Sequence, residues 1–249
     1  KRKAYQNQTG DIRRGVWYGT VSYKTGVWPI SLEIAGARLS LNQDGSVQLQ
    51  VGATEIGQGA DTVFSQMAAE TLHMDISRVH IVTQQDTDVT PFDTGAYASR
   101  QSFVTGTAVK ECAQQLKQKI LEYARTLVPG NVDRLELEDG YILADGKPAI
   151  SLEDLAMESY YSLSNSSVLT AEVSRQVKKN TVASGCCFAE VEVDMKLGKI
   201  KVLDIVNVHD SGTLLNPQLA AMQVHGGMFM GIGYGVSEQL LIDEKTGRH

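Results

Sequence analysis

A cluster of glycine and amide residues at positions 54–59, Thr-Glu-Ile-Gly-Gln-Gly, is the first part of the sequence suited to ligand binding. Gly57 and Gly59 flank Gln58 and let the backbone approach a ligand closely, and free N–H groups at a helix N-terminus suit an anionic or carbonyl oxygen. The spacing is not GxGxxG and no βαβ pattern surrounds it, so it does not predict a dinucleotide site. Taken alone, the cluster also fits a plain turn between a strand and a helix.

A second cluster, residues 93–101, ends in Ser99, Arg100 and Gln101 at the entrance of an expected helix. These side chains offer a hydroxyl, a fork of guanidinium donors and an amide beside the positive end of the helix dipole. That set fits a phosphate or a polar heterocycle. The alternative for this cluster is a helix cap with a solvated arginine.

A third cluster begins at residues 209–217 and continues to Gln223. Asn216 followed by Pro217 is a typical start of a helix. Each glycine inside a helix costs about 1 kcal/mol relative to alanine, so we expect another group to pack very close to this helix backbone. The glycines concerned are Gly226, Gly227, Gly231, Gly233 and Gly235.

Other kinds of chemistry have little support in the sequence. There is no GxSxG motif, and His209, Asp210 and Ser211 are neighbours, whereas a catalytic triad converges from separated positions. The five histidines show no HxH or HxxxH spacing, which argues against a metal cage. The three cysteines form no CxxC pair and are expected to be buried thiols of a protein in a reducing compartment: Cys112, Cys186 and Cys187.

Composition limits the classes of partner. The chain has 249 residues with 23 basic and 29 acidic side chains, a net charge of −6, and therefore no global positive field for nucleic acid. No apolar stretch reaches the length of about 18 residues that a membrane span needs, and no signal peptide is visible. We expect a cytoplasmic protein that binds neither nucleic acid nor membrane. The start at Lys1 and the hairpin-like residues 245–249 suggest a fragment.

The first half of the chain predicts elements that would position the first two clusters. Alternating apolar residues after the Asp44-Gly45 turn predict a strand over 45–51, and three- and four-residue spacing predicts a helix over 58–73. A short strand over 79–82 and a loop over 84–100 precede a long helix that ends at Pro129-Gly130. A loop of this length between two core elements favours a function.

The second half predicts hairpins and one more helix. Two short strands are expected around Asp139-Gly140 within 135–150, and Ser151 is expected to cap a short helix. Residues 162–184 are weakly patterned, 187–194 alternate as a strand, and 200–208 suit a central strand. The predicted fold class is α+β, with mixed, largely antiparallel sheets packed with helices.

Together the clusters resemble the molybdenum-binding subunit of the xanthine dehydrogenase and aldehyde oxidase family of molybdenum hydroxylases. Residues 55–59 look like the family's E-x-G-Q-G loop, and residues 97–101 are similar to its Y-[GA]-S-R-[SQ] loop. Residues 210–227 follow the D-x-G-x-x-x-N-P-x(5)-Q-x-x-G-G signature. The three motifs occur in the family's order over roughly 175 residues, which is more specific than any one alone.

The resemblance implies roles for matching positions. Gln58 would donate to an oxo or sulfido ligand of molybdenum without coordinating the metal, while Gln223 and the backbone of residues 96–100 would hold the pterin. Such ligands need several N–H and amide donors, because molybdenum is held by the pterin itself. The implied cofactor-binding residues are Gly57, Gln58, Gly59, Ala96, Tyr97, Ala98, Ser99, Arg100, Gln101, Asn216 and Gln223.

The resemblance also implies a reaction. Such subunits hydroxylate a purine-like heterocycle such as xanthine or hypoxanthine, with water as the oxygen donor, and pass electrons to FAD and [2Fe-2S] centres in partner domains or subunits. The molybdenum-molybdopterin cofactor can carry a cytosine nucleotide in bacterial members. Nicotinate, aldehydes and other N-heterocycles remain alternative substrates, and a non-catalytic module with the same fold is the alternative from another class.

The sequence departs from the family pattern in ways that limit this implication. Met222 replaces the glycine that many members have before Gln223. The family's glutamate base lies well downstream of the Q-x-x-G-G helix, and Glu238 is too close to fill that role. The resemblance therefore implies no catalytic residue in this chain, which alone should fold without turnover, and it leaves Trp28 as a candidate for substrate stacking.

The expected organisation follows from the same motifs. Residues 1–249 are expected to be the C-terminal molybdopterin-binding region of a larger subunit. Within it we expect one subdomain formed by residues 16–130 and 185–249, and an intervening portion formed by residues 131–184.

Overall fold

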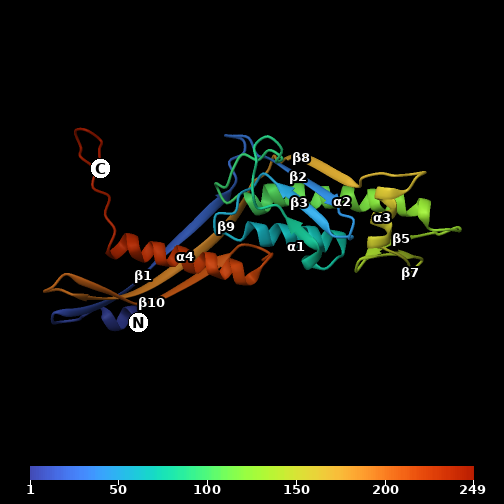
Figure 1. The fold of residues 1–249 in the computed structure, drawn as a ribbon. Helices are drawn as coiled ribbons and strands as arrows, with labels where there is room; N and C mark the ends of the chain where they lie inside the picture. The colour runs from blue at the N-terminus through green and yellow to red at the C-terminus, as the bar shows by residue number, and fades with distance from the viewer. The chain divides into compact units, whose positions relative to one another are not determined.

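The structure is a computed structural model that describes all residues from Lys1 to His249. Contacts within the chain divide it into two compact units (Figure 1). We call Lys24–Thr181 the central unit, and Lys1–Tyr23 together with Val182–His249 the terminal unit. Each unit is described by itself.

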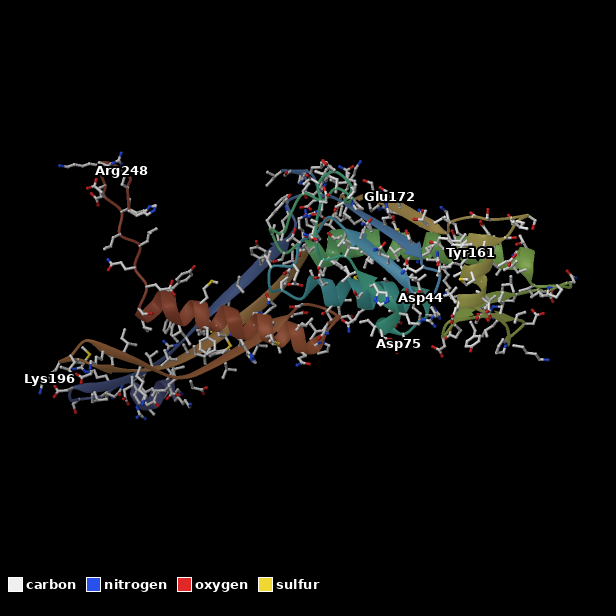
Figure 2. The ribbon with its side chains drawn as sticks, viewed as in Figure 1. Asp44, Asp75, Tyr161, Glu172, Lys196 and Arg248 are labelled. Atoms are coloured by element: carbon white, nitrogen blue, oxygen red, sulfur yellow. The ribbon has the colours of Figure 1, made fainter.

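A mixed four-stranded sheet forms the centre of the central unit, in the order β4-β3-β2-β8. The predicted strand is confirmed: Val47, Leu49 and Val51 are buried, because they occupy every second position. Asp44, labelled in Figure 2, stabilises the preceding turn by accepting from the Ser46 N–H at 2.9 Å. The strands are β2 (Ile34–Leu41), β3 (Val47–Val51), β4 (Val79–Ile81) and β8 (Thr170–Gln176).

Two helices supply most of the remaining core of the central unit. Helix α1 (Ala60–Leu72) packs against α2 (Gln101–Leu127), and α2 also contacts β2 and β8. Both helices were predicted, and their apolar stripes are buried: Phe64 is 1% exposed and Leu116 is 0% exposed. Burying each such side chain stabilises the fold by about 1.5–3 kcal/mol.

A small antiparallel sheet, β5-β6-β7, follows α2. Both turns have positive φ at two successive residues, Asp139-Gly140 and Asp145-Gly146, which suits tight hairpins. The sequence predicted two strands here and the structure has three: β5 (Leu135–Glu138), β6 (Tyr141–Ala144) and β7 (Lys147–Ser151). Ser151 caps α3 (Leu152–Tyr161) as expected, since its hydroxyl accepts from the Asp154 N–H at 3.0 Å.

Strand β8 was not predicted, because it lies in the weakly patterned residues 162–184. Ala171 and Val173 are its buried apolar residues, and Glu172 between them, labelled in Figure 2, is exposed. The strand pairs antiparallel with β2, with Val173 opposite Ala37. Apolar residues therefore alternate with polar ones at only two positions of β8. That is too few to predict a strand within a segment as polar as residues 162–184.

The terminal unit contains a three-stranded sheet and one long helix. Its sheet order is β1-β9-β10, formed by β1 (Ile12–Thr25), β9 (Thr181–Asp194) and β10 (Lys199–Asp210), and the helix is α4 (Pro217–Val236). Strands β9 and β10 form the predicted hairpin, whose turn contains Lys196 (Figure 2). The prediction of a central strand over 200–208 was wrong: β10 lies at the edge, and the unpredicted strand β1 lies at the other edge.

The two units do not coincide with the subdomains expected from the sequence. Residues 131–181 belong to the central unit, because β8 pairs with β2 and α3 contacts α2. The fully buried apolar core lies between Ala35 and Val173, and no apolar residue of the terminal unit belongs to it. The α+β fold class itself is confirmed, with antiparallel pairing in every sheet and one parallel pair, β3 with β4. None of the helices combines the length and apolar character required to cross a lipid bilayer.

Candidate functional site

The loop of residues 54–59, which we call the glutamine loop, connects β3 to α1. Gly57 and Gly59 have φ values of 99° and 85°, which explains the two glycines. The carboxylate of Glu55 accepts from the N–H groups of Gly57, Gly59 and Asp61 at 2.7, 3.0 and 3.1 Å. Glu55 therefore occupies the helix N-terminus that the sequence suggested for an anionic ligand.

The backbone donors around the Glu55 carboxylate also affect the pKa values of nearby acidic groups. Burial opposes ionisation of the carboxyl group, but the backbone N–H donors of Gly59, Asp61 and Gly57 outweigh burial and lower the pKa of Glu55. Burial and the nearby Glu55 charge raise the pKa of Asp61. The end of α1 thus holds one stable internal anion.

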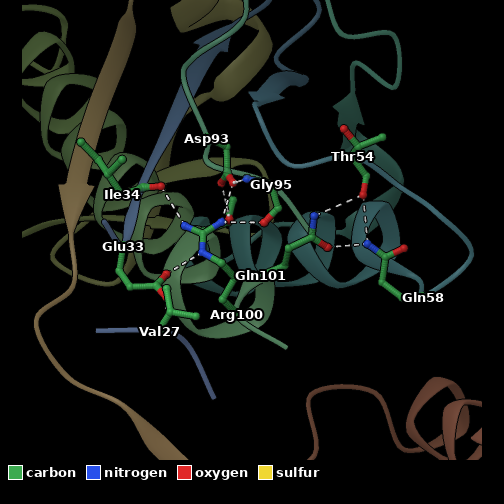
Figure 3. A network of polar contacts seen from close by, with 10 residues as sticks. Val27, Glu33, Ile34, Thr54, Gln58, Asp93, Gly95, Arg100 and Gln101 are labelled. Atoms are coloured by element: carbon green, nitrogen blue, oxygen red, sulfur yellow. Dashed lines mark hydrogen bonds and ion pairs between the residues drawn. The ribbon is translucent and has the colours of Figure 1, made fainter. Parts of the chain in front are cut away.

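Gln58 lies at the tip of the glutamine loop and is engaged through both ends of its amide. Its Oε1 accepts from the Ile56 N–H at 2.7 Å, and its Nε2 donates to the Thr54 carbonyl at 3.0 Å and to Oε1 of Gln101. Gln101 also donates to the Thr54 carbonyl, at 3.2 Å (Figure 3). The structure therefore joins two of the predicted clusters through their glutamines.

Residues 93–101, which we call the arginine loop, lead into α2. Ala98 and Ser99 have φ values of 49° and 53°, a left-handed conformation that is costly for residues with a side chain. The backbone N–H groups of residues 96–99 donate to no group of the protein, and Ala96, Tyr97 and Ser99 are exposed. Successive N–H groups in such a conformation can receive a ligand with electron-rich oxygen or sulfur atoms.

Arg100 is oriented differently from the sequence expectation. Its guanidinium is 0% exposed and bonds inward to carboxylates and carbonyls, so it neither faces a phosphate nor extends into solvent as a solvated cap. Burial opposes the charge, but the bonds to Glu33 and Asp93 outweigh burial and raise the pKa of Arg100 above its ordinary value. The Arg100 N–H donates to the Tyr97 carbonyl at 3.2 Å, so the unpaired backbone donors of this loop are those of residues 96–99.

Gly36 and Gly52 allow residues 91–93, which lead into the arginine loop, to pack very closely against the central sheet. A Cβ at Gly52 would lie 2.1 Å from the Pro91 carbonyl oxygen, and a Cβ at Gly36 would lie 2.7 Å from the Pro91 Cβ. Asp93 also forms an isolated β-bridge with Ala35. These close contacts require glycine, because backbone atoms cannot move aside as a flexible side chain can.

Trp28 lies in the segment before β2 and is half-buried. Its carbonyl accepts from Lys24 Nζ at 2.9 Å and from Asn180 Nδ2 at 2.6 Å. The same segment is bonded to the arginine loop, since the Gly26 N–H donates to the Ala98 carbonyl at 2.8 Å. Trp28 therefore belongs to a segment attached to the arginine loop.

The third predicted cluster belongs to the terminal unit, and the first two belong to the central unit. Asn216 caps α4 as predicted, with its Oδ1 accepting from the Leu219 N–H at 3.0 Å. Gln223 lines an apolar cavity of about 800 Å³ between α4 and the β9-β10 hairpin. The expected close packing against the α4 glycines is found only at Gly233, where a Cβ would meet Oε1 of Glu238. A Cβ at any of the other four meets nothing within 4 Å: Gly226, Gly227, Gly231 and Gly235.

Sequence reasoning overlooked Glu33, the buried partner of Arg100. The available signal was a single acidic residue at the start of the apolar segment 34–37. A charge in that position is rarely buried unless it is paired. The partner, 67 residues away, could not be assigned from local patterns.

Comparisons with known proteins place these loops in a family. A model of the molybdopterin cofactor-binding domain family matches residues 1–249. The chain is 49% identical to the xanthine dehydrogenase molybdenum-binding subunit of Escherichia coli O157:H7 over 99% of the chain and 33% of that protein. It is 31% identical to the probable hypoxanthine oxidase XdhD of Escherichia coli K12, over 95% of the chain and 24% of that protein.

Solved structures show the same fold. Quinoline 2-oxidoreductase from Pseudomonas putida 86 superposes with a TM-score of 0.82 at 22% identity, covering 96% of this chain and 32% of its own. The chain spans about a third of the length of the relatives named above, or less. Because the family model matches its whole length, the chain belongs to the molybdopterin cofactor-binding domain family.

Proposed function

We propose that this chain is the part of a molybdenum hydroxylase that holds the molybdenum end of molybdopterin. The observation that carries the proposal is the hydrogen bond between Gln58 and Gln101, which joins an amide donor to a loop with four unpaired backbone N–H groups. In the longer protein we propose hydroxylation of xanthine or hypoxanthine with water as the oxygen donor. The 49% identity to a xanthine dehydrogenase subunit supports that choice over nicotinate or an aldehyde.

The donor set of the central unit fits this cofactor. Oxo and dithiolene groups accept hydrogen bonds, and the arginine loop offers the N–H groups of residues 96–99 and the exposed hydroxyl of Ser99. A Cβ built at Gly57 meets nothing within 4 Å, so there is space beside the glutamine loop. When bound, the molybdenum centre would supply the two-electron oxidation.

Gln58 and the arginine loop would then contact different parts of the cofactor. Gln58 would donate from Nε2 to an oxygen or sulfur ligand of the metal, and the backbone of residues 96–100 would hold the pterin. Both Nε2 protons of Gln58 are engaged, with Thr54 and Gln101, so the amide must release one of these bonds to reach the cofactor. Asn216 and Gln223 are proposed as further cofactor contacts.

The remaining parts of the enzyme are proposed to lie elsewhere. The glutamate base, the FAD and the [2Fe-2S] centres are assigned to other segments or partner subunits of a cytoplasmic complex. The nucleotide form of the cofactor is proposed to be the cytosine dinucleotide, which bacterial members with this type of arginine loop commonly carry. Trp28 is proposed to stack on the heterocyclic substrate.

A substrate panel tests the proposal. The intact protein is assayed with xanthine, hypoxanthine, nicotinate and an aromatic aldehyde in ¹⁸O-labelled water, together with Gln58→Ala and the control Gln118→Ala, which changes an exposed residue on α2. We expect label in the hydroxylated purine, and a kcat about 10–100-fold lower for Gln58→Ala alone. No turnover of any substrate by a metal-loaded protein would favour the non-catalytic module, and equal rates for both variants would show that Gln58 does not serve the metal.

A further inference from the structure

Three charged side chains lie inside the central unit without solvent exposure. The side chains of Arg100, Glu33 and Asp93 are 0%, 1% and 0% exposed. Nε of Arg100 donates to Glu33 at 2.6 Å, and Nη1 donates to Asp93 at 2.5 Å (Figure 3). Two carboxylates therefore share one guanidinium, which we call the buried charge cluster.

Stability alone does not account for such a cluster. Burying charges requires their desolvation, and well-packed apolar residues of similar volume often stabilise a protein as well or better. The role of the cluster is therefore better explained by the backbone segments that its hydrogen bonds hold in place.

The cluster connects two segments that are distant in sequence, residues 27–34 and residues 93–105. Glu33 accepts from the Val27 N–H at 2.5 Å, beside the segment that bears Trp28. Asp93 accepts from the Gly95 N–H at 2.8 Å and from the Thr105 hydroxyl at 2.7 Å, on the first turns of α2. Arg100 donates to the carbonyls of Gly95 and Ile34 at 2.9 and 2.8 Å.

These bonds hold both ends of residues 96–99. Gly95 is fixed at one end by Asp93 and Arg100, and Arg100 itself is the other end. Between them, Ala98 and Ser99 keep their left-handed conformation, which costs about 1–2 kcal/mol per residue and must be imposed by the surroundings. The unpaired N–H groups are thus presented by a segment that the cluster clamps.

We propose that Arg100 is a positioning residue that acts through Glu33 and Asp93 to fix residues 96–99, and thereby sets how firmly the cofactor is retained. This inference rests on the proposed function. The guanidinium does not touch the cofactor, and its effect passes entirely through the backbone of the arginine loop.

The test uses the intact, metal-loaded protein. Glu33→Gln keeps the shape and one acceptor oxygen, and the ion pair of Arg100 with Asp93 remains, so this variant is expected to fold. Arg100→Lys keeps the charge, but a single ammonium group cannot replace the four bonds that the guanidinium makes to the Glu33 and Asp93 carboxylates and to the Ile34 and Gly95 carbonyls. Arg175→Lys is the matched control, because Arg175 pairs with Glu111 on the exposed side of the same unit, with its side chain 52% exposed.

Two measurements are made at a temperature where circular dichroism shows every protein to be folded. One is the rate at which bound molybdenum is lost on dilution into a chelator. The other is hydrogen exchange of residues 95–101 in the loaded protein. We expect Glu33→Gln and Arg100→Lys to lose molybdenum about tenfold faster and to exchange faster only in this segment, while Arg175→Lys matches the wild type.

The outcomes separate this inference from the proposed function. A wild-type protein without molybdenum would refute the proposed function. A loaded wild type whose folded Glu33→Gln variant loses metal at the same rate would refute the positioning role alone. Failure of Glu33→Gln to fold would also refute it, because the cluster would then maintain the fold rather than the loop.

Discussion

The glutamine loop and the arginine loop are held in different ways. The glutamine loop is exposed at Thr54, Ile56 and Gly57 and is fixed by one partly buried carboxylate, Glu55, on backbone N–H groups. The arginine loop is fixed by the buried charge cluster. The difference follows from what each loop would present: the Gln58 side chain can adjust by rotation, whereas backbone N–H groups point correctly only if the whole segment is fixed.

Replacing Arg100 should have the largest effect on stability. Arg100→Met leaves Glu33 and Asp93 buried without a counter-charge, so we expect the free energy of unfolding of the central unit to fall by about 3–5 kcal/mol. Denaturant titration with a tryptophan fluorescence readout measures this. The equivalent change at the exposed pair, Arg175→Met, should cost less than about 1 kcal/mol, and equal losses in the two variants would contradict the account.

Adding a side chain at Gly52, beside the start of the arginine loop, should have the next largest effect on stability. Gly52→Ala places a Cβ against the Pro91 carbonyl, so we expect a loss of about 1–3 kcal/mol and increased protease sensitivity near residues 91–95. Gly19→Ala is the control, because a Cβ there meets nothing within 4 Å. A Gly52→Ala protein as stable and as protease-resistant as Gly19→Ala would show that the loop does not rest on this glycine.

Neutralising Glu55 should have a smaller effect that depends on pH. The lowered pKa means that the folded state favours the carboxylate, so its contribution is complete above the ordinary value of 4.5 and is lost as the pH falls through the folded-state pKa. We expect Glu55→Gln to cost about 1 kcal/mol at pH 7 and less as the pH falls below 4.5. Thermal unfolding from pH 3 to 7 checks this, and a difference that stays constant or grows toward low pH would contradict it.

Removing Gln101 should have an effect on stability as small as that of neutralising Glu55. Gln101→Ala deletes one bond to Gln58 and one to Thr54, both at partly buried positions, so we expect a loss of about 0.5–1.5 kcal/mol. Because Gln58 still donates to the Thr54 carbonyl, the glutamine loop should keep its conformation. Hydrogen exchange of residues 54–59 measures this, and exchange as fast as in an unfolded peptide would show that Gln101 is the main support.

Local features of the fold were predictable from the sequence. The caps at Ser151 and Asn216, the turns at Asp139 and Asp145 and the helix that became α2 each depend on neighbouring residues. Helix caps and tight turns need particular side chains at fixed positions, so their signals survive in a single sequence. Strand β8 lacked such a signal, because it is held by pairing with the distant strand β2 and its own composition is largely polar.

The support of the site was less predictable than its motifs. Gln58 and Gln101 were both named, but their contact spans 43 residues and depends on where β3 ends and where α2 begins. Arg100 was named for its donors, yet its burial depends on Glu33 and Asp93. The α4 glycines predicted a closely packed neighbour, and within this chain only Gly233 has one, the Glu238 side chain. Local spacing identifies which residues are unusual, whereas the direction of a side chain is decided by non-local packing.

The ratio of molybdenum to subunit in the purified intact protein tests the central claim most directly. Metal analysis and pterin fluorescence after acid release should both give close to one equivalent for the wild type. Gln58→Ala should keep most of the pterin, because the arginine loop that would hold it is unchanged. A folded wild-type protein with neither molybdenum nor pterin, prepared in a host that loads a related molybdenum hydroxylase, would contradict the account.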